Sequence, residues 1–389
     1  MAMDLSRTYT WVMPAKLVFG PGSAKQVGTE LKDLGGSKVL IVTDRGVLGA
    51  GILSGIIETL GSAGIGHAIF SDVEPNPSTT CVHAAAKAFT KNGCDCLLAV
   101  GGGSSIDTAK AAGVILNNPG KTLQQMEGAG KFSNPLPPFI AIPTTCGTAA
   151  ESTRTAVITD PDTHYKFPIH SPLMFPKVAL IDGTLLTKLP APIIAATGMD
   201  ALCHALESYV NLNCQPVSEC LDLKAITMIS EWLRPAVANA SLKAMSYMVL
   251  ASTIAGMGFS NTGVTIVHAM SHPISGFHGV PHGVANAILL PYVMDYNLIG
   301  NPHRFADVAQ AMGVDTFDMT PMEAARASVT AVRELAHDVG IPETFKDFGV
   351  DYSHLDEMVE DTFKSGNIPL NPVKPTRDAI VKIYRQAIG

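Results

Sequence analysis

Strand-like and helix-like segments alternate along the first half of this chain, and no other feature restricts the fold as strongly. Short apolar runs rich in β-branched residues, typical of strands buried on both faces, are separated by segments with helical spacing. We expect strands at residues 38–44, 67–72, 94–100, 138–143 and 178–182, and helices at residues 50–62, 79–92 and 108–116. This alternation predicts a parallel sheet covered by helices.

The pattern changes near residue 185. From about residue 193 onward, apolar residues recur at helical spacing and no convincing strand follows. A chain of 389 residues also exceeds the usual size of one hydrophobic core, so two domains are expected. We therefore predict an α/β domain over residues 1–184 and an all-helical domain over residues 185–389.

Composition excludes several classes of function. Apolar residues make up 47% and charged residues 16% of the chain, which is typical of a globular protein. The net charge of -7, without any Lys/Arg cluster, argues against nucleic acid as a partner. No apolar run approaches the roughly 20 residues of a membrane-spanning helix, and a secretory signal is not expected at the N-terminus. Seven irregularly spaced cysteines favour a reducing, cytoplasmic setting.

A glycine-rich run, Gly101-Gly-Gly-Ser104-Ser-Ile-Asp107, follows an expected strand and precedes an expected helix. Glycine lets the backbone approach a phosphate closely, and the N–H groups at a helix N-terminus attract anions. Ser104 is also a candidate helix cap. A tight strand–helix turn without a ligand is the alternative, although three successive glycines exceed what a turn requires. The run matches neither the GxGxxG pattern nor a Walker loop.

Two further features at expected strand ends suit a nucleotide. The cluster Thr144-Thr145-Cys146-Gly147-Thr148 offers hydroxyl groups to a phosphate or a ribose, although a plain glycine-containing loop explains it equally well. Asp44 ends a strand, where a carboxylate accepts hydrogen bonds from a ribose diol and repels a 2′-phosphate, which favours NAD over NADP. From its local sequence alone, a helix cap or a turn residue is the simpler interpretation of Asp44.

A cluster of histidines follows in the second half. Four of the twelve histidines fall within fifteen residues, at His268, His272, His278 and His282. Upstream, Asp200 and His204 are four residues apart, so on a helix they share one face. Carboxylate and neutral imidazole suit Fe(II), Zn(II) and similar divalent metals, and the absence of cysteines at ligand spacing argues against a structural zinc site.

Which of these histidines bind a metal stays open from spacing alone. His268 and His272 are four residues apart, but Pro273 disfavours α geometry at His272. Pro281-His282-Gly283 is expected to be a turn-like loop that returns His282 to the metal. Histidines that do not bind are candidates for proton relay, because imidazole titrates near neutrality.

Five motifs, taken together, resemble the iron-dependent (group III) alcohol dehydrogenases along nearly the whole chain. They are Gly-Gly-Gly-Ser-x-x-Asp-x-x-Lys at 101–110, Ile-Pro-Thr-Thr-x-Gly-Thr at 142–148, Gly-Met-Asp-Ala-x-x-His-Ala-x-Glu at 198–207, His-Ala-Met-Ser-His-Pro at 268–273 and Pro-His-Gly-Val-Ala-Asn at 281–286. Within the family, the likeness is to lactaldehyde reductases (1,2-propanediol oxidoreductases) and to butanol, methanol and 1,3-propanediol dehydrogenases. The resemblance implies the dehydroquinate synthase-like fold: a Rossmann-like, dinucleotide-binding α/β domain, an all-helical metal-binding domain and an active site in the cleft between them.

The resemblance also implies roles for individual residues. The implied metal ligands are Asp200, His204, His268 and His282. His272 is left beside the metal as the candidate catalytic residue for proton relay, and His278 receives no role. The implied cofactor contacts are Asp44, Gly102, Gly103, Ser104, Asp107, Thr144, Thr145, Thr148, Thr153 and Lys166.

The resulting hypothesis is an NAD-dependent, iron-containing alcohol dehydrogenase, with Zn(II) or another divalent metal as the alternative to Fe(II). It transfers a hydride reversibly between NAD(H) and a small primary alcohol or diol and its aldehyde. The metal serves as a Lewis acid, and His272 passes the released proton to water. A homodimer or larger homo-oligomer is expected. Arg154-Thr155 and the short segment 235–243 depart from the family pattern and leave the substrate open.

Three alternatives remain from the sequence. A dehydroquinate synthase-like lyase needs cations around the metal for its phosphorylated, carboxylated substrate, yet Lys224, Arg234 and Lys243 are the only Lys or Arg between Ile193 and Pro302. A zinc-dependent, glycerol dehydrogenase-like polyol dehydrogenase differs in metal content and in polyol activity. A non-catalytic metal- or nucleotide-binding protein would bind both groups without turnover.

Overall fold

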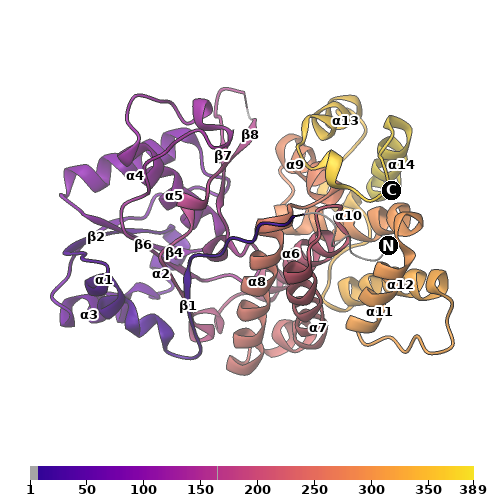
Figure 1. Cartoon of the computed structure of the whole chain (residues 1–389), viewed down its shortest axis with the longest axis horizontal. Helices are drawn as coiled ribbons and strands as arrows, with labels where there is room; N and C mark the ends of the chain where they lie inside the picture. The colour runs from indigo at the N-terminus through magenta and orange to yellow at the C-terminus, as the bar shows by residue number, and fades with distance from the viewer. Residues whose placement is uncertain (1–7, 164) are drawn as a thin grey trace. The chain divides into compact units, whose positions relative to one another are not determined.

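The computed structural model describes residues 8–163 and 165–389 of the chain. These residues form two compact units, whose helices and strands are labelled in Figure 1. The α/β unit comprises Val12–Lys188, and the helical unit comprises Leu189–Gly389 together with residues 8–11. The domain division expected between residues 184 and 185 stays a prediction.

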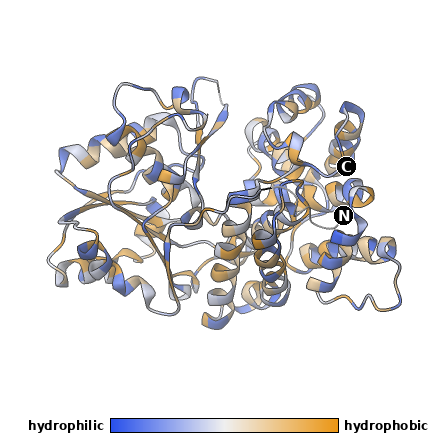
Figure 2. Cartoon of the chain, viewed as in Figure 1, coloured by the Kyte–Doolittle hydropathy of each residue, from blue (hydrophilic) through white to orange (hydrophobic). Residues whose placement is uncertain are grey.

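The larger sheet of the α/β unit has six strands in the described residues, in the order β1-β9-β6-β4-β2-β3. The strands are β1 (Lys16–Phe19), β2 (Lys38–Val42), β3 (Gly66–Phe70), β4 (Cys96–Gly101), β6 (Phe139–Pro143) and β9 (Val178–Ile181). All neighbouring strands run parallel, as the alternating sequence pattern predicts. Because β4 and β6 are buried along their whole length, they consist almost entirely of apolar residues (Figure 2).

Side chains of the central strands alternate between two apolar cores, one on each face of the sheet. The helices of this unit are α1 (Val27–Asp33), α2 (Arg45–Gly49), α3 (Leu53–Ser62), α4 (Thr79–Lys91) and α5 (Gly103–Asn117). Leu40 and Leu97 enter the core formed with α4 and α5. Ile41 and Leu98 enter the opposite core, formed with α1 and α3. Each strand therefore contributes to both layers of helices.

A second, three-stranded sheet is not anticipated by the sequence pattern. It consists of β5 (Gly128–Ala129), β8 (Lys166–His170) and β7 (Thr155–Thr159). β7 and β8 form an antiparallel pair, and β5 runs parallel to β8. Both longer strands bury only every second residue, and β8 contains Pro168, which counts against a strand in a sequence pattern.

The helical unit contains no strand in its described residues, as predicted. Its helices are α6 (Ala191–Val210), α7 (Pro216–Asn239), α8 (Leu242–Thr262), α9 (Ile266–His278), α10 (His282–Asn297), α11 (Pro302–Ala311), α12 (Pro321–Asp338), α13 (Leu355–Lys364) and α14 (Arg377–Ile388). Among the described helices, only α8 is long and apolar enough to cross a membrane by length and composition, and 56% of its most apolar window is buried inside the protein. It packs against α6 and α7, as the core helix of a bundle does.

Three local expectations are wrong. α9 continues through Pro273, because the residues on either side of His272 are buried and this packing outweighs the pre-proline preference. His282 does not lie in a turn but is the first residue of α10. α5 begins at Gly103 with Gly102 as its N-cap, so Ser104 lies inside the first turn and does not cap the helix. The three glycines conceal this start, because glycine is a poor helix former.

Candidate metal centre and phosphate loop

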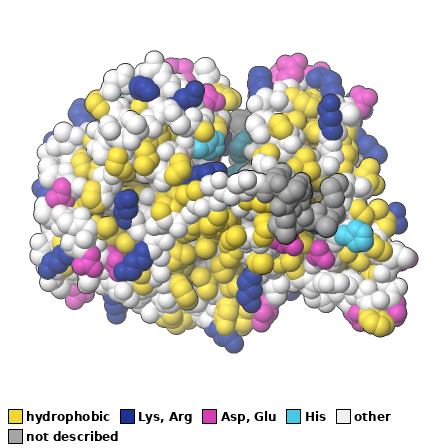
Figure 3. All heavy atoms as spheres, viewed as in Figure 1, with side chains coloured by type: hydrophobic (Ala, Val, Ile, Leu, Met, Phe, Trp, Pro, Cys, Tyr) yellow, Lys and Arg dark blue, Asp and Glu magenta, His cyan; other side chains and the backbone are white. Residues whose placement is uncertain are grey.

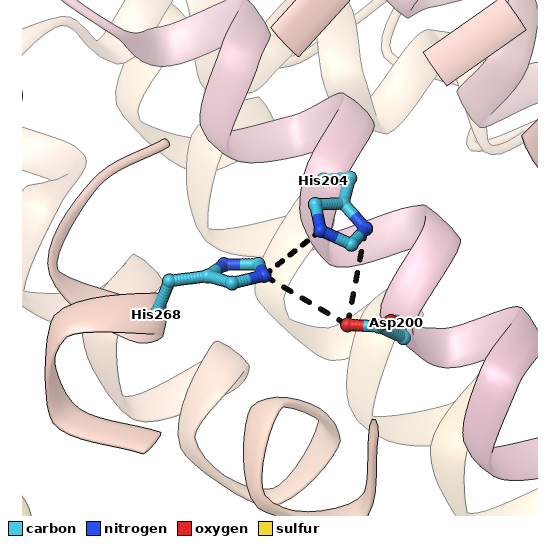
Figure 4. A group of neighbouring side chains, drawn as sticks. All are labelled: Asp200, His204 and His268. Carbon is cyan, nitrogen blue, oxygen red and sulfur yellow. Dashed lines mark hydrogen bonds and ion pairs between the residues drawn. The ribbon is translucent and has the colours of Figure 1, made fainter. Parts of the chain in front are cut away.

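Three helices bring the histidine cluster together. α6 carries Asp200 and His204 one turn apart, and these residues are 2% and 6% exposed. α9 supplies His268 from its first turn, 4% exposed, and α10 supplies His282 as its first residue. Figure 4 shows Asp200, His204 and His268 pointing toward one another. The side chain of His282 is 31% exposed, so the cluster is accessible from that side.

Asp200, His204 and His268 each offer one ligand-type atom, and these atoms lie within 4.8 Å of one another. Asp200 Oδ1 lies 3.8 Å from His204 Nδ1, 3.8 Å from His268 Nε2 and 3.9 Å from His282 Nε2. The Nε2 atoms of His204 and His268 are 3.0 Å apart. Atoms that bind one ion at about 2.1 Å lie roughly 3 to 3.5 Å from one another, so the spacing is close to that of a coordination shell.

The side-chain amide of Asn286, on α10, lies against the same atoms. Its Nδ2 is 2.7 Å from Asp200 Oδ1 and 3.1 Å from both His268 Nε2 and His282 Nε2. An amide nitrogen has two hydrogens, which cannot satisfy three acceptors at once. A divalent cation would accept the lone pairs of all the imidazoles and of the carboxylate together. The cluster therefore fits a bound metal, and its nitrogen and oxygen donors suit Fe(II) or Zn(II).

Glu207 supports the cluster from behind. It is 1% exposed, and its Oε2 accepts a short hydrogen bond from Nδ1 of His268, whose opposite nitrogen faces the other ligand atoms. Although burial raises the pKa of Glu207, the His268 ring and the Thr265 hydroxyl hold its net pKa below the usual value. Glu207 is therefore an anion. A carboxylate in this position is the usual partner of a metal-bound histidine.

A second group of ligand-type residues, Cys203, Glu207 and His268, lies next to the first. Burial raises the pKa of the Cys203 thiol well above its usual value, so the sulfur stays protonated and is a poor metal ligand. Both oxygens of Glu207 already accept hydrogen bonds. These properties favour the group that contains Asp200 as the metal site.

The two remaining histidines of the cluster differ in position. The His272 ring lies 5.5 Å from the His282 ring and 6.4 Å from the His268 ring, centre to centre, and is partly exposed. His272 thus lies next to the four proposed metal ligands and is not one of them. His278, at the end of α9, lies beside His354 instead, with 5.9 Å between ring centres.

The glycine loop lies where the order of the strands in the larger sheet changes direction. From β2 the chain proceeds to its neighbour β3, whereas β4 lies on the other side of β2. In parallel sheets, ligands bind outside the carboxyl ends of strands at such a switch point. Asp44 lies just beyond the end of β2, and Gly102 connects the last residue of β4, Gly101, to the first residue of α5, Gly103, so both candidate cofactor segments lie at this point.

The threonine cluster packs directly over the glycines. A Cβ atom on Gly103 would lie 2.8 Å from Thr148 Cγ2, and one on Gly102 would lie 3.2 Å from Thr145 Cγ2. The backbone N–H of Thr144 donates to the carbonyl of Gly101 over 3.0 Å. The structure thus brings together Gly102, Gly103, Ser104, Thr144, Thr145 and Thr148 around the N-terminus of α5.

Asp44 caps α2, as its local sequence suggests. Its Oδ1 accepts a hydrogen bond from the backbone N–H of Val47 over 2.9 Å. Its Oδ2 lies 3.5 Å from the position of a Cβ on Gly101, so this second oxygen faces the glycine loop. The cap therefore uses one oxygen of the carboxylate and leaves the other directed at the glycine loop, where its contact with a cofactor stays a prediction.

The other predicted cofactor residues have structural partners. Asp107 accepts a hydrogen bond from the N–H of Val157 over 3.0 Å, and burial raises its pKa to about 6. Thr153 is buried and accepts bonds from Nζ of Lys110 through its carbonyl (2.9 Å) and its hydroxyl (3.0 Å). Lys166 donates to Asn76 Oδ1 over 2.9 Å. Their contacts with a cofactor stay predictions.

Sequence reasoning did not single out three residues that organise these sites, namely Lys110, Glu207 and Asn286. Each lies within a quoted motif, at helical spacing from a residue that was assigned a role: three residues after Asp107, three after His204 and four after His282. That spacing was the available signal, because residues three or four apart share a helix face.

The similarity to known proteins extends over both units. Residues 14–183 match iron-containing alcohol dehydrogenases, and residues 194–388 match the C-terminal part of the Fe-containing alcohol dehydrogenase family. The 1,3-propanediol dehydrogenase of Citrobacter freundii is 42% identical over 384 residues, covering 98% of this chain and 99% of that protein. The lactaldehyde reductase of Escherichia coli (strain K12) is 40% identical over 370 residues, covering 95% and 97%. A crystal structure of a 1,3-propanediol oxidoreductase gives a TM-score of 0.96 at 41% identity, covering 98% and 100%.

Proposed function

The chain belongs to the iron-containing alcohol dehydrogenase family, and from this premise we propose that it transfers a hydride reversibly between NAD(H) and a small primary alcohol or diol and its aldehyde. The observation that carries the proposal is the clustering of Asp200, His204, His268 and His282. These four residues would hold the metal. When bound there, Fe(II) or another divalent metal polarises the oxygen of the alcohol as a Lewis acid.

The residues of the chain supply positioning and proton transfer. His272 lies beside the cluster and is partly exposed, and an imidazole can both accept and donate a proton, so it is suited to carry the alcohol proton to water. Asp200 is deeply buried, and the imidazoles of His204, His282 and His268 outweigh that burial and lower its pKa. The carboxylate is therefore charged and available to a cation throughout the neutral pH range.

The glycine loop and Asp44 support NAD as the cofactor. The N-terminus of α5 presents backbone N–H groups at a switch point of a parallel sheet, which suits a diphosphate. The Oδ2 atom of Asp44 faces this loop. A carboxylate there accepts a ribose diol and repels the 2′-phosphate of NADP. The hydride chemistry belongs to the nicotinamide, and the protein positions it.

The helical unit supports a small, uncharged substrate. Between Ile193 and Pro302 the Lys and Arg residues are Lys224, Arg234 and Lys243. Arg234 pairs with Asp338 over 2.7 Å, and Nζ of Lys243 lies 4.8 Å from the Trp232 ring centre. Arg234 and Lys243 therefore already have partners within the helical unit. The relatives named for 1,3-propanediol and lactaldehyde suggest a short alcohol or diol.

The expected setting and partners follow from the same features. On the face drawn in Figure 3, Lys and Arg side chains are scattered among Asp and Glu without forming a basic cluster. This face therefore offers no basic patch of the kind that binds nucleic acid. A cytoplasmic homodimer or larger homo-oligomer remains part of the proposal.

The experiment measures NADH formation from small alcohols and diols with metal-stripped protein, before and after anaerobic reloading with Fe(II) or Zn(II). Restoration by Fe(II) alone supports the iron-dependent reaction, and the alcohol panel then names the substrate. Equal rescue by Zn(II), with glycerol as the preferred alcohol, points to the polyol dehydrogenase. Tight metal uptake without NADH under any condition refutes the dehydrogenase proposal.

A further inference from the structure

The two oxygens of Glu207 bind two different parts of α9. Oε1 accepts hydrogen bonds from the N–H of Thr265 (2.9 Å), the hydroxyl of Thr265 (2.5 Å) and the N–H of Val267 (2.9 Å). Thr265 is the N-cap residue of α9, so this oxygen satisfies donors at the start of the helix. Oε2 accepts from Nδ1 of His268, one turn into the same helix, and also lies 3.6 Å from the Cys203 sulfur.

These contacts determine which nitrogen of His268 carries a proton. A carboxylate only accepts hydrogen bonds, so the nitrogen that faces Glu207 must be the donor. Nδ1 of the neutral ring is then protonated and Nε2 keeps its lone pair. Nε2 is the atom that lies 3.0 Å from His204 Nε2 and 3.8 Å from Asp200 Oδ1. The lone pair of His268 Nε2 therefore points toward the other proposed metal ligands, His204 and Asp200.

We propose that Glu207 is a positioning residue for the metal: it holds both the ring of His268 and the start of the helix that carries the ring, and so keeps Nε2 directed at the other proposed ligands. The inference rests on the metal site of the proposed function, but not on the hydride reaction. It also explains why a second buried carboxylate lies beside the ligands without facing Asp200, His204 and His282 itself.

The substitution Glu207→Gln isolates this role. The amide has nearly the same size, and its oxygen can still accept from Thr265 and Val267. Its nitrogen then faces His268 Nδ1 as a donor, which requires Nδ1 to be the acceptor and moves the ring proton to Nε2. The proton would occupy the position that the metal needs. We therefore expect the dissociation constant for Zn(II) to rise by about 10- to 100-fold, the usual effect of losing such a partner.

Two matched variants separate positioning from stability. Thr265→Val removes one hydrogen bond to Oε1 and leaves the bond to His268, so it should lower the midpoint of thermal unfolding while the dissociation constant stays within about threefold. Cys203→Ala removes the sulfur from Oε2 and should likewise leave metal affinity unchanged. A large loss of affinity in Cys203→Ala would instead place the metal in the group of Cys203, Glu207 and His268.

The measurement is chelator competition with Zn(II) and Co(II), together with the visible spectrum of the Co(II) protein. We expect Glu207→Gln to weaken both metals and to change the Co(II) bands, while both control variants keep the wild-type spectrum. A dissociation constant in Glu207→Gln within about threefold of wild type, with unchanged Co(II) bands, overturns the inference.

A second readout covers the case in which Glu207→Gln does not fold. In the Zn(II)-loaded wild-type protein labelled with ¹⁵N-histidine, His268 should show a protonated Nδ1 and a metal-bound Nε2. The opposite assignment refutes the role of Glu207. Because both readouts measure metal binding, a protein that binds metal through this arrangement but forms no NADH would refute the proposed reaction and leave the role of Glu207 standing.

Discussion

Single buried polar residues connect the elements around the glycine loop and around the proposed metal ligands. Nζ of Lys110 is buried and donates to the carbonyl and hydroxyl of Thr153 and, over 2.8 Å, to the carbonyl of Thr155. This lysine ties the helix that starts at the glycine loop to the start of β7. Asn286 makes a comparable link between Asp200 and His282. Such residues hold the side chains and the helix start to which we assign binding roles.

Lys166 gives a pH-dependent prediction. Burial lowers the pKa of Lys166 to about 8 in the free protein. The diphosphate of a bound NADH favours the charged lysine, so the pKa is higher in the complex. Affinity is then full below about pH 8 and falls as the pH rises above it. We expect the dissociation constant of NADH to increase several-fold between about pH 7 and about pH 9.5, measured by fluorescence titration.

The matched variant for this prediction is Lys166→Arg. Arginine stays charged across this pH range, so the variant should lose the pH dependence. A flat profile in the wild-type protein, or an equal slope in Lys166→Arg, would show that another group is responsible.

At this scale, the sequence identified residues by their chemistry but not by their geometry. Asp200, His204, His268 and His282 were recognisable as ligand types with family support, and the structure brings them together. Glu207 was not assigned a role, because the sequence of an apolar helix does not show which groups donate hydrogen bonds to a glutamate on it. The same holds for Asn286. Hydrogen-bond partners depend on packing between helices that are far apart in sequence.

At the scale of helices and strands, the sequence pattern was most informative where elements are buried on both faces. β4 and β6 are apolar throughout, so their positions were predicted closely. The pair β7 and β8 was missed, because each strand is short and half exposed. Two helix boundaries were predicted incorrectly. α5 starts earlier than expected, at Gly103, and α9 continues through Pro273 instead of being interrupted there.

The approach of Thr148 to the N-terminus of α5 gives a prediction for Gly103→Ala. The added Cβ would lie 2.8 Å from Thr148 Cγ2 and 3.0 Å from Thr148 Oγ1, so either the helix start or the threonine must shift. We expect NADH affinity to fall by at least about 10-fold, or about 1.4 kcal/mol, while Zn(II) affinity stays unchanged. Isothermal titration with each ligand measures both.

Gly55→Ala is the control for this substitution. Gly55 lies within α3 of the same unit, and a Cβ there would meet nothing within 4 Å. It should keep wild-type NADH affinity and gain about 0.5 to 1 kcal/mol of stability, since alanine is the better helix former. Equal NADH affinities in Gly103→Ala and Gly55→Ala would contradict a phosphate-binding role for the loop.

At the scale of the whole molecule, the division into an α/β unit and a helical unit separates the proposed cofactor residues from the proposed metal ligands. This division was visible in the sequence, because the periodicity of apolar residues changes along the chain. The substrate was not, since short alcohols differ by few atoms and leave no clear pattern in sequence. The distribution of charge in the sequence nevertheless favours a substrate without a negative charge.

The stretch that supplies the proposed metal ligands has few cations, with only Lys224, Arg234 and Lys243 between Ile193 and Pro302, and this gives a prediction about substrate charge. Propane-1,3-diol and propane-1,2-diol should be oxidised with a kcat/KM at least about 100-fold higher than that of 3-hydroxypropanoate, because the carboxylate finds no cation to replace its hydration. Steady-state kinetics with the Fe(II)-loaded protein measures the ratio. Similar values for the diols and the acid would indicate a cation near the substrate that the present assignment lacks.

The spread of the metal-binding residues over α6, α9 and α10 has a consequence for how the protein acquires its metal in the cell. Apart from Asp200 and His204, no two of the proposed ligands lie on the same helix. A ribosome-bound chain therefore lacks a complete site until α10 has emerged and docked against α6. Metal loading is then a late event in biosynthesis, after the glycine-loop unit has been synthesised.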